Sequence, residues 1–113
     1  MDIKEIETDL SNKLSKKRFI HTLGVVNSAM YLAKKYGANI EDAHLAALLH
    51  DCAKEIPLLE MHDLVADLPC DQDMLHSGAL LHGLAGMVLA NTQYGVTNPD
   101  ILEAIRVHTT GKE

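Results

Sequence analysis

The sequence predicts an all-α fold, and three observations carry this prediction. Apolar residues recur at helical spacing almost throughout the chain. No run of four or more strand-forming residues alternates cleanly with polar ones. Helix-stop and helix-start residues separate the apolar segments, as at Gly37 and at Asn98 followed by Pro99. With 113 residues and no linker or repeat, the chain is expected to be a single domain, residues 1–113, forming a compact bundle of about five to six helices.

The first three expected helices occupy the N-terminal half of the chain. An amphipathic segment covers Ile3 to Leu14, and a second helix spans about Lys16 to Tyr36 before Gly37 ends it. Asn39 is the expected N-cap of the third helix, which runs to about Glu55. The apolar stripe of the second helix is expected to include Ile20, Leu23, Ala29, Leu32 and Ala33.

Three further helices are expected in the C-terminal half. A short helix covers Leu58 to Ala66, and the stretch "DLPCDQDMLHSG" that follows it is expected to be a polar connector. The next helix covers about Ala79 to Gln93. The last begins at the N-cap Asn98, has Pro99 at its first helical position, and is expected to end at Gly111.

Charge and composition narrow the classes of partner. The formal net charge of −6 argues against a nucleic-acid polymer, because phosphate backbones are bound by an excess of Lys and Arg. No apolar run approaches the ~20 residues that span a bilayer, so we expect no membrane partner and a cytoplasmic location. Cys52 and Cys70 fit no disulfide framework and are expected to be reduced packing thiols. Base rate alone makes a homodimer plausible.

Histidine is the unusual component, because the chain has seven histidines but one Phe and no Trp. His21, His50, His82 and His108 fall among apolar residues on four separate expected helices, and Asp51 adjoins His50. A lone histidine on an apolar face is more often a core residue satisfied by one hydrogen bond. One metal centre satisfies four imidazoles and a carboxylate together, so the pattern favours metal binding. An ordinary bundle with satisfied core histidines stays the alternative.

The stretch "LLHDCAK", residues 48–54, places polar groups in a helical apolar pattern. Helical spacing puts His50 and Lys54 on the inward stripe with Asp51 beside them. A buried charge costs several kcal/mol unless it is paired, so Asp51 indicates a cationic partner. Lys54 is either a solvated cation at a helix end or a ligand for a phosphate oxygen. The remaining histidines lie in polar contexts and are expected on the surface: His44, His62 and His76.

Four stretches of the chain resemble a known family: "RFIHTLGVVNSAMYLAKKYG", "AALLHDCAKE", "LLHGLAG" and "ILEAIRVHTTG". They are similar to the HD-domain superfamily of metal-dependent phosphohydrolases, and most closely to its bacterial YqeK-type members, the symmetrical diadenosine tetraphosphate hydrolases. The likeness covers nearly the whole chain, in order and at the right spacing. It implies an all-α HD domain that cleaves a small-molecule nucleotide, a dinucleoside tetraphosphate, into two nucleoside diphosphates.

The resemblance also implies a metal centre. His21, His50 and Asp51 match ligands of a first metal, with Asp51 as the bridge, and His82 and His108 match ligands of a second metal. The implied cofactor is a pair of divalent transition-metal ions, with iron first. Manganese, cobalt and zinc also suit imidazole and carboxylate ligands.

Three more residues match the family's motifs. Lys54 matches the lysine that follows the HD pair, and with Asp51 it is expected to be catalytic. Lys54, Arg18 and Thr109 are expected to bind substrate, with the cations neutralising phosphate oxygens as charge develops. The nucleophile is expected to be a metal-activated water, so no Ser or Cys nucleophile is required.

The family pattern continues beyond "HTTG" into further helices, one of which supplies another metal-binding Asp. No Asp follows His108 in this chain, which is therefore expected to be a C-terminally shortened form of the domain. Two alternatives follow. One is an HD phosphohydrolase for another nucleotide, and the other is a catalytically incomplete helical module that binds a metal or a nucleotide.

Overall fold

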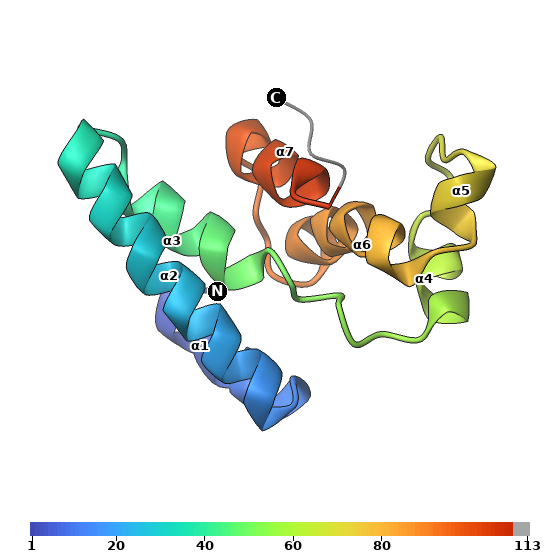
Figure 1. Ribbon diagram of the computed structural model, residues 1–113, viewed down its shortest axis with the longest axis horizontal. Coiled ribbons are helices and arrows are strands. Elements are labelled where there is room, and N and C mark those ends of the chain that lie inside the picture. The colour runs from blue at the N-terminus through green and yellow to red at the C-terminus, as the bar shows by residue number, and fades with distance from the viewer. Residues whose placement is uncertain (110–113) are drawn as a thin grey trace.

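The computed structural model describes residues 1–109, which fold into seven α-helices with no strand in that range (Figure 1). In chain order the helices are α1 (Ile3–Lys13), α2 (Lys16–Tyr36), α3 (Ile40–Leu49), α4 (Leu58–Leu64), α5 (Gln72–Leu75), α6 (Gly78–Thr92) and α7 (Pro99–Val107). Figure 1 shows α1, α2 and α3 at one end, α4 and α5 at the other, and α6 and α7 between them. The all-α prediction is confirmed. Within the described part of the chain, every helix is too short or too polar to cross a membrane.

The helix caps follow the chemistry of the local sequence. Gly37 ends α2 in the left-handed conformation, with φ of 74°, as its lack of a side chain allows. The Asn39 side chain accepts a hydrogen bond from the backbone N–H of Asp42 at the start of α3. Asn98 caps α7 in the same way, with Pro99 at the first helical position. These three predicted helix ends are confirmed.

The predicted extent of α3 is wrong, because the helix ends at Leu49 rather than near Glu55. Residues 50–55 form a run of turns closed by hydrogen bonds from residue i+3 back to residue i. The Cys52 amide donates to the Leu49 carbonyl at 3.1 Å, and the Lys54 amide donates to the Asp51 carbonyl at 2.9 Å. Lys54 is therefore not on a helical stripe, and its predicted place there is wrong.

The other boundaries differ by smaller amounts. The predicted polar connector contains α5, a single helical turn capped by the Asp71 side chain. The short helix α4 ends at Leu64 rather than Ala66. The ring of His62, which we expected on the surface, is half-buried and hydrogen-bonds through Nε2 to the Leu75 carbonyl, fastening α4 to α5. The predicted end of the last helix, Gly111, lies outside the described residues.

Two hydrophobic clusters form the core and meet at the turn of residues 50–55. The larger cluster joins α1, α2, α3 and α7 with the end of α6, and the smaller one joins α4 with the first part of α6. Cys52 belongs to the larger cluster and Ala53 to the smaller. Asp51 precedes them and so lies where the two halves of the molecule join.

The buried face of α2 differs from the predicted stripe. Ile20 is 60% exposed and Leu32 is 50% exposed, so their predicted burial is wrong, whereas Ala33 is buried as expected. The helix is covered mainly by α3 on one side, and its solvent side is left open. Thr22 lies on the buried face instead, and its hydroxyl has no hydrogen-bond partner within residues 1–109.

Thr22→Val is expected to stabilise the fold by about 1 kcal/mol, because it removes an unpaired buried hydroxyl and keeps the branched shape. Urea denaturation of both proteins measures the change in the free energy of unfolding. Thr8→Val is the control, because the Thr8 hydroxyl is exposed and donates to the Lys4 carbonyl at 3.0 Å. A less stable Thr22→Val protein would contradict the prediction.

Candidate metal centre

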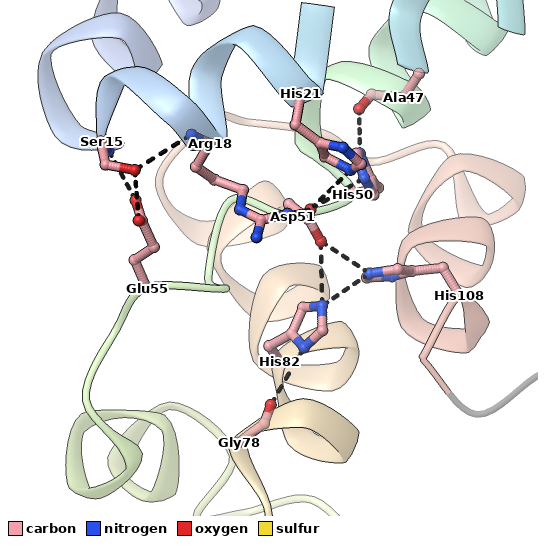
Figure 2. Close-up of polar contacts among 10 residues, drawn as sticks. All are labelled: Ser15, Arg18, His21, Ala47, His50, Asp51, Glu55, Gly78, His82 and His108. Carbon is pink, nitrogen blue, oxygen red and sulfur yellow. Dashed lines mark hydrogen bonds and ion pairs between the residues drawn. The ribbon is translucent and has the colours of Figure 1, made fainter. Parts of the chain in front are cut away.

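Asp51 is the centre of the site and is only 5% exposed. It lies in the turn that follows α3, at the junction of the two hydrophobic clusters. Figure 2 shows Arg18 and four histidine side chains gathered around its carboxylate. The two carboxylate oxygens face different neighbours, so Asp51 divides the site into two halves.

The first half surrounds Asp51 Oδ2 and is built from α2 and the end of α3. Arg18 Nη1 donates to Oδ2 at 3.0 Å, and His50 Nε2 lies 3.2 Å from the same oxygen. His21 Nε2 lies 3.6 Å from it. Arg18 and His21 stand three residues apart, so both project from one side of α2 toward Asp51.

The second half surrounds Asp51 Oδ1 and is built from α6 and the end of α7. His82 Nε2 lies 3.1 Å from Oδ1, and His108 Nε2 lies 3.3 Å from it. The two Nε2 atoms are 3.0 Å from each other. His82 is buried, whereas the side chain of His108 is partly open to solvent.

Backbone carbonyls orient three of the four rings. Nδ1 of His50 lies 2.6 Å from the Ala47 carbonyl oxygen, and Nδ1 of His108 lies 2.6 Å from that of Ile105. Nδ1 of His82 lies 3.2 Å from the Gly78 carbonyl oxygen. A carbonyl oxygen can only accept, so each Nδ1 carries a proton and donates it. In a neutral ring this leaves Nε2 with a free lone pair directed at Asp51.

This donor set fits cations. The Nε2 lone pairs of His82 and His108 face each other at 3.0 Å, where they repel unless a positive charge lies among them. Neutral imidazole nitrogens and a carboxylate are the ligands that divalent transition metals prefer. The side chains form two groups, each with its ligand atoms within 4.8 Å of one another: His21, His50 and Asp51 in one, and Asp51, His82 and His108 in the other. Either group could hold a divalent metal ion, and the two share Asp51.

The pKa shifts keep the central carboxylate ionised. Burial by itself would raise the pKa of Asp51. When the rings of His108, His50 and His82 carry a proton on Nε2, the hydrogen bonds that they donate outweigh burial and hold this pKa well below its usual range. Burial lowers the pKa of His50, but its hydrogen bonds to Asp51 and to the Ala47 carbonyl outweigh burial, so the pKa is raised overall. Asp51 is therefore available as an anionic ligand at neutral pH.

The side chains of the other residues predicted to belong to the site have no hydrogen bond or ion pair with the Asp51 side chain within residues 1–109. Lys54 is half-buried in the 50–55 turn, and its ammonium makes no ion pair or hydrogen bond within residues 1–109. The Thr109 hydroxyl donates to the Leu80 carbonyl at 2.8 Å and so ties the end of α7 to α6. Cys52 is a buried free thiol whose pKa is raised by burial to about 12. The predicted packing role of Cys52 is consistent with its burial.

One contact beside the site was not predicted from the sequence. Glu55, at the end of the turn, accepts hydrogen bonds from both the backbone N–H and the hydroxyl of Ser15, the N-cap of α2 (Figure 2). The two residues are 40 positions apart in the sequence, which no local pattern can bridge. The sequence feature that points to such a contact is the start of α2, which has three basic residues and no acidic residue in its first turn. A carboxylate from elsewhere in the chain is therefore favoured there.

A separate cleft of about 560 Å³ lies on another face of the same turn. Three carboxylates line it, from Glu55, Glu60 and Asp63, and none of the four site histidines does. The three carboxylates outnumber the one cation of the lining, Lys13, and carboxylates repel phosphate, so this cleft does not suit a polyphosphate. One side of the metal centre is open to solvent, because the His21 side chain is half exposed.

Comparisons with known proteins find relatives of this chain. The chain is 38% identical over 113 residues to the symmetrical bis(5'-nucleosyl)-tetraphosphatase of Bacillus subtilis (strain 168), covering 99% of this chain and 61% of the relative. The enzyme of the same name from Halalkalibacterium halodurans is 42% identical over 100 residues, covering 88% of this chain and 54% of the relative. This chain therefore spans little more than half the length of these relatives.

A solved structure and a family model match as well. The structure is a Clostridium acetobutylicum protein described as a "predicted HD superfamily hydrolase involved in NAD metabolism". It has a TM-score of 0.90 and 35% sequence identity, and the match covers 96% of this chain and 58% of that one. The model of the HD domain matches residues 18–113, most of the chain. The predicted resemblance is thus confirmed, and the chain belongs to the HD domain family.

Proposed function

We propose that this chain is the HD domain of a metal-dependent phosphohydrolase that cleaves diadenosine tetraphosphate symmetrically into two ADP. The observation that carries the proposal is the division of the Asp51 carboxylate between two pairs of histidines, one pair at each oxygen. Bridged pairs of metal ions are a recurring arrangement for displacement at phosphorus. The substrate follows from the relatives, which carry the name of this activity at 38% and 42% identity.

In this proposal the side chains hold and orient the reactants. His21 and His50 with Asp51 Oδ2 would hold one divalent ion, and His82 and His108 with Asp51 Oδ1 would hold the other. When bound, such ions polarise a phosphate and lower the pKa of a water molecule. The carbonyl hydrogen bonds at Nδ1 keep three of the rings in the tautomer that coordination requires.

Two cations are proposed to contact the phosphates. Arg18 is partly exposed and lies 3.0 Å from Asp51 Oδ2, so a phosphate next to that oxygen is within its reach. Lys54 makes no polar contact with residues 1–109, so its ammonium is available to bind a phosphate. Both would neutralise phosphate oxygens as charge develops. Cys52 is excluded as the nucleophile, because it is buried and its raised pKa keeps it protonated.

Iron is the metal that we propose first, on the resemblance to YqeK-type proteins, and the donor set also suits manganese, cobalt and zinc. A different nucleotide substrate is the second candidate, because the Clostridium acetobutylicum relative is described as involved in NAD metabolism. Thr109 binds the Leu80 carbonyl, so its role in substrate binding stays a prediction. Homodimer formation and a cytoplasmic location also stay predictions.

Product analysis tests this proposal. The purified chain is incubated with diadenosine tetraphosphate and Mn²⁺ or Fe²⁺, and the nucleotides are separated by ion-exchange chromatography. Symmetrical cleavage consumes one water and yields ADP alone, whereas asymmetrical cleavage yields ATP and AMP. His82→Ala is expected to abolish ADP formation, and His76→Ala, at an exposed histidine outside the site, is expected to leave it unchanged. Turnover of another nucleotide but not of diadenosine tetraphosphate would favour the second candidate.

A further inference from the structure

We propose that Glu55 is a positioning residue of the metal centre: by binding Ser15, its carboxylate holds the first turn of α2, and with it His21 and Arg18, against Asp51. This inference rests on the proposed function, because it concerns the group of His21, His50 and Asp51, which is proposed to hold one of the two metal ions. Glu55 has no contact with the histidines themselves and acts only through the helix that it holds.

The contact between Glu55 and Ser15 is made by both carboxylate oxygens. The Ser15 backbone N–H donates to Oε1 at 2.7 Å, and the Ser15 hydroxyl donates to Oε2 at 2.6 Å. The same hydroxyl accepts a hydrogen bond from the Arg18 amide at 3.2 Å, which is the N-cap interaction of α2. Glu55 therefore fixes the orientation of the hydroxyl that begins the helix.

The charge of Glu55 also compensates an unfavourable helix start. The first turn of α2 carries Lys16, Lys17 and Arg18 and has no acidic residue, although the N-terminal end of a helix favours negative charge. Glu55 supplies that charge from outside the helix. The hydrogen bonds from Ser15 lower the pKa of Glu55, so its carboxylate is ionised at neutral pH.

His21 depends on this support more than the other three histidines do. Their rings are oriented by carbonyl groups at Nδ1, whereas His21 has no such hydrogen bond within residues 1–109, and its side chain is 50% exposed. Helix α2 packs mainly on α3 and to a small extent on α1, and it does not pack closely on α6 or α7, which carry His82 and His108. The position of His21 therefore depends on the packing of α2 against α3 and on the contact that holds its first turn.

Glu55→Gln tests the inference, because it keeps the size of the side chain and removes its charge and one acceptor. Glu60→Gln is the matched control, because Glu60 is an exposed acid in the neighbouring cleft with no side-chain hydrogen bond within the described residues. Mn²⁺ titration by calorimetry is expected to show two ions bound to the wild type and to Glu60→Gln. In Glu55→Gln one of the two should bind about 10-fold more weakly or worse, the usual effect of removing an outer support of a metal ligand.

A double-mutant cycle separates positioning from a general loss of stability. In a His21→Ala background, Glu55→Gln should weaken metal binding no further, because the ligand through which it acts has been removed. If Glu55→Gln binds both ions like the wild type, or weakens binding equally with and without His21, the inference is wrong.

A metal-free measurement keeps this inference distinct from the proposed function. In the apo protein, Glu55→Gln should shift the NMR resonances of the His21 ring and speed hydrogen exchange at the Arg18 and Phe19 amides, which bond to Ser15. If the wild type binds no metal, the proposed function fails on its own. Unchanged His21 resonances in the apo variant would overturn the positioning role in that case too.

Discussion

Asp51→Asn is expected to abolish hydrolysis and to leave at most one metal ion bound. The substitution preserves the shape of the side chain but removes the negative charge and turns one of the two oxygens into an amide that donates. That single residue supplies a ligand atom to both metal groups, so both lose an anionic donor at once. Losing roughly 4 kcal/mol of transition-state stabilisation corresponds to about a 10³-fold fall in rate, and we expect at least that.

The measurement is ADP formation from diadenosine tetraphosphate, together with metal content by elemental analysis. Asp63→Asn is the matched control, because it makes the same change of charge at an exposed residue outside the two metal groups. Hydrolysis in Asp51→Asn within 10-fold of the wild type would mean that a carboxylate at this position is not required, and it would remove the basis of the proposed mechanism.

Gly83→Ala is expected to displace the end of α7 from α6 and to weaken the second metal group. A Cβ atom at Gly83 would lie 2.6 Å from the Arg106 carbonyl oxygen and 2.7 Å from the Thr109 hydroxyl. It would lie 3.2 Å from the carbonyl oxygen of Ile105, the group that orients the His108 ring. Two of these atoms belong to the backbone, so the helix itself must move. Overpacking of this kind costs about 1–3 kcal/mol of stability.

Thermal unfolding and Mn²⁺ titration of Gly83→Ala measure the two effects. The ion in the group of Asp51, His82 and His108 should bind more weakly, because His108 moves with α7. The control is Gly24→Ala, where a Cβ atom meets nothing within 4 Å and the added methyl should stabilise α2 by up to about 1 kcal/mol. If the Gly83→Ala protein were as stable as the Gly24→Ala protein, the predicted clash between α6 and α7 would be wrong.

Local chemistry explains why much of the fold was predictable. Three helix ends could be predicted because each cap forms hydrogen bonds only with residues close to it in the sequence. These caps are Gly37 of α2, Asn39 of α3 and Asn98 of α7. The end of α3 was missed because the turns of residues 50–55 continue to bury Cys52 and Ala53. Over six residues, a run of i to i+3 turns has nearly the same apolar spacing as an α-helix.

The sequence was enough to predict which residues form the site, but not which histidines lie at each oxygen of Asp51. Placing four histidines among apolar residues was enough to indicate that they would meet Asp51, and the structure brings all five together. Which histidines share each oxygen depends on how α2, α6 and α7 pack around the turn, and nothing in the spacing of the residues specifies that. The contact of Glu55 with Ser15 depends on the same packing. The grouping that the resemblance implied is the same as the one found in the structure.

The most direct test of the account is a crystal structure of this chain grown with Mn²⁺, with anomalous scattering measured at the manganese edge. We expect two peaks, one between Asp51 Oδ2 and the Nε2 atoms of His21 and His50, and one between Asp51 Oδ1 and the Nε2 atoms of His82 and His108. A map without a peak at either group, or with manganese only at residues away from Asp51, would contradict the shared-carboxylate metal centre on which the proposed function depends.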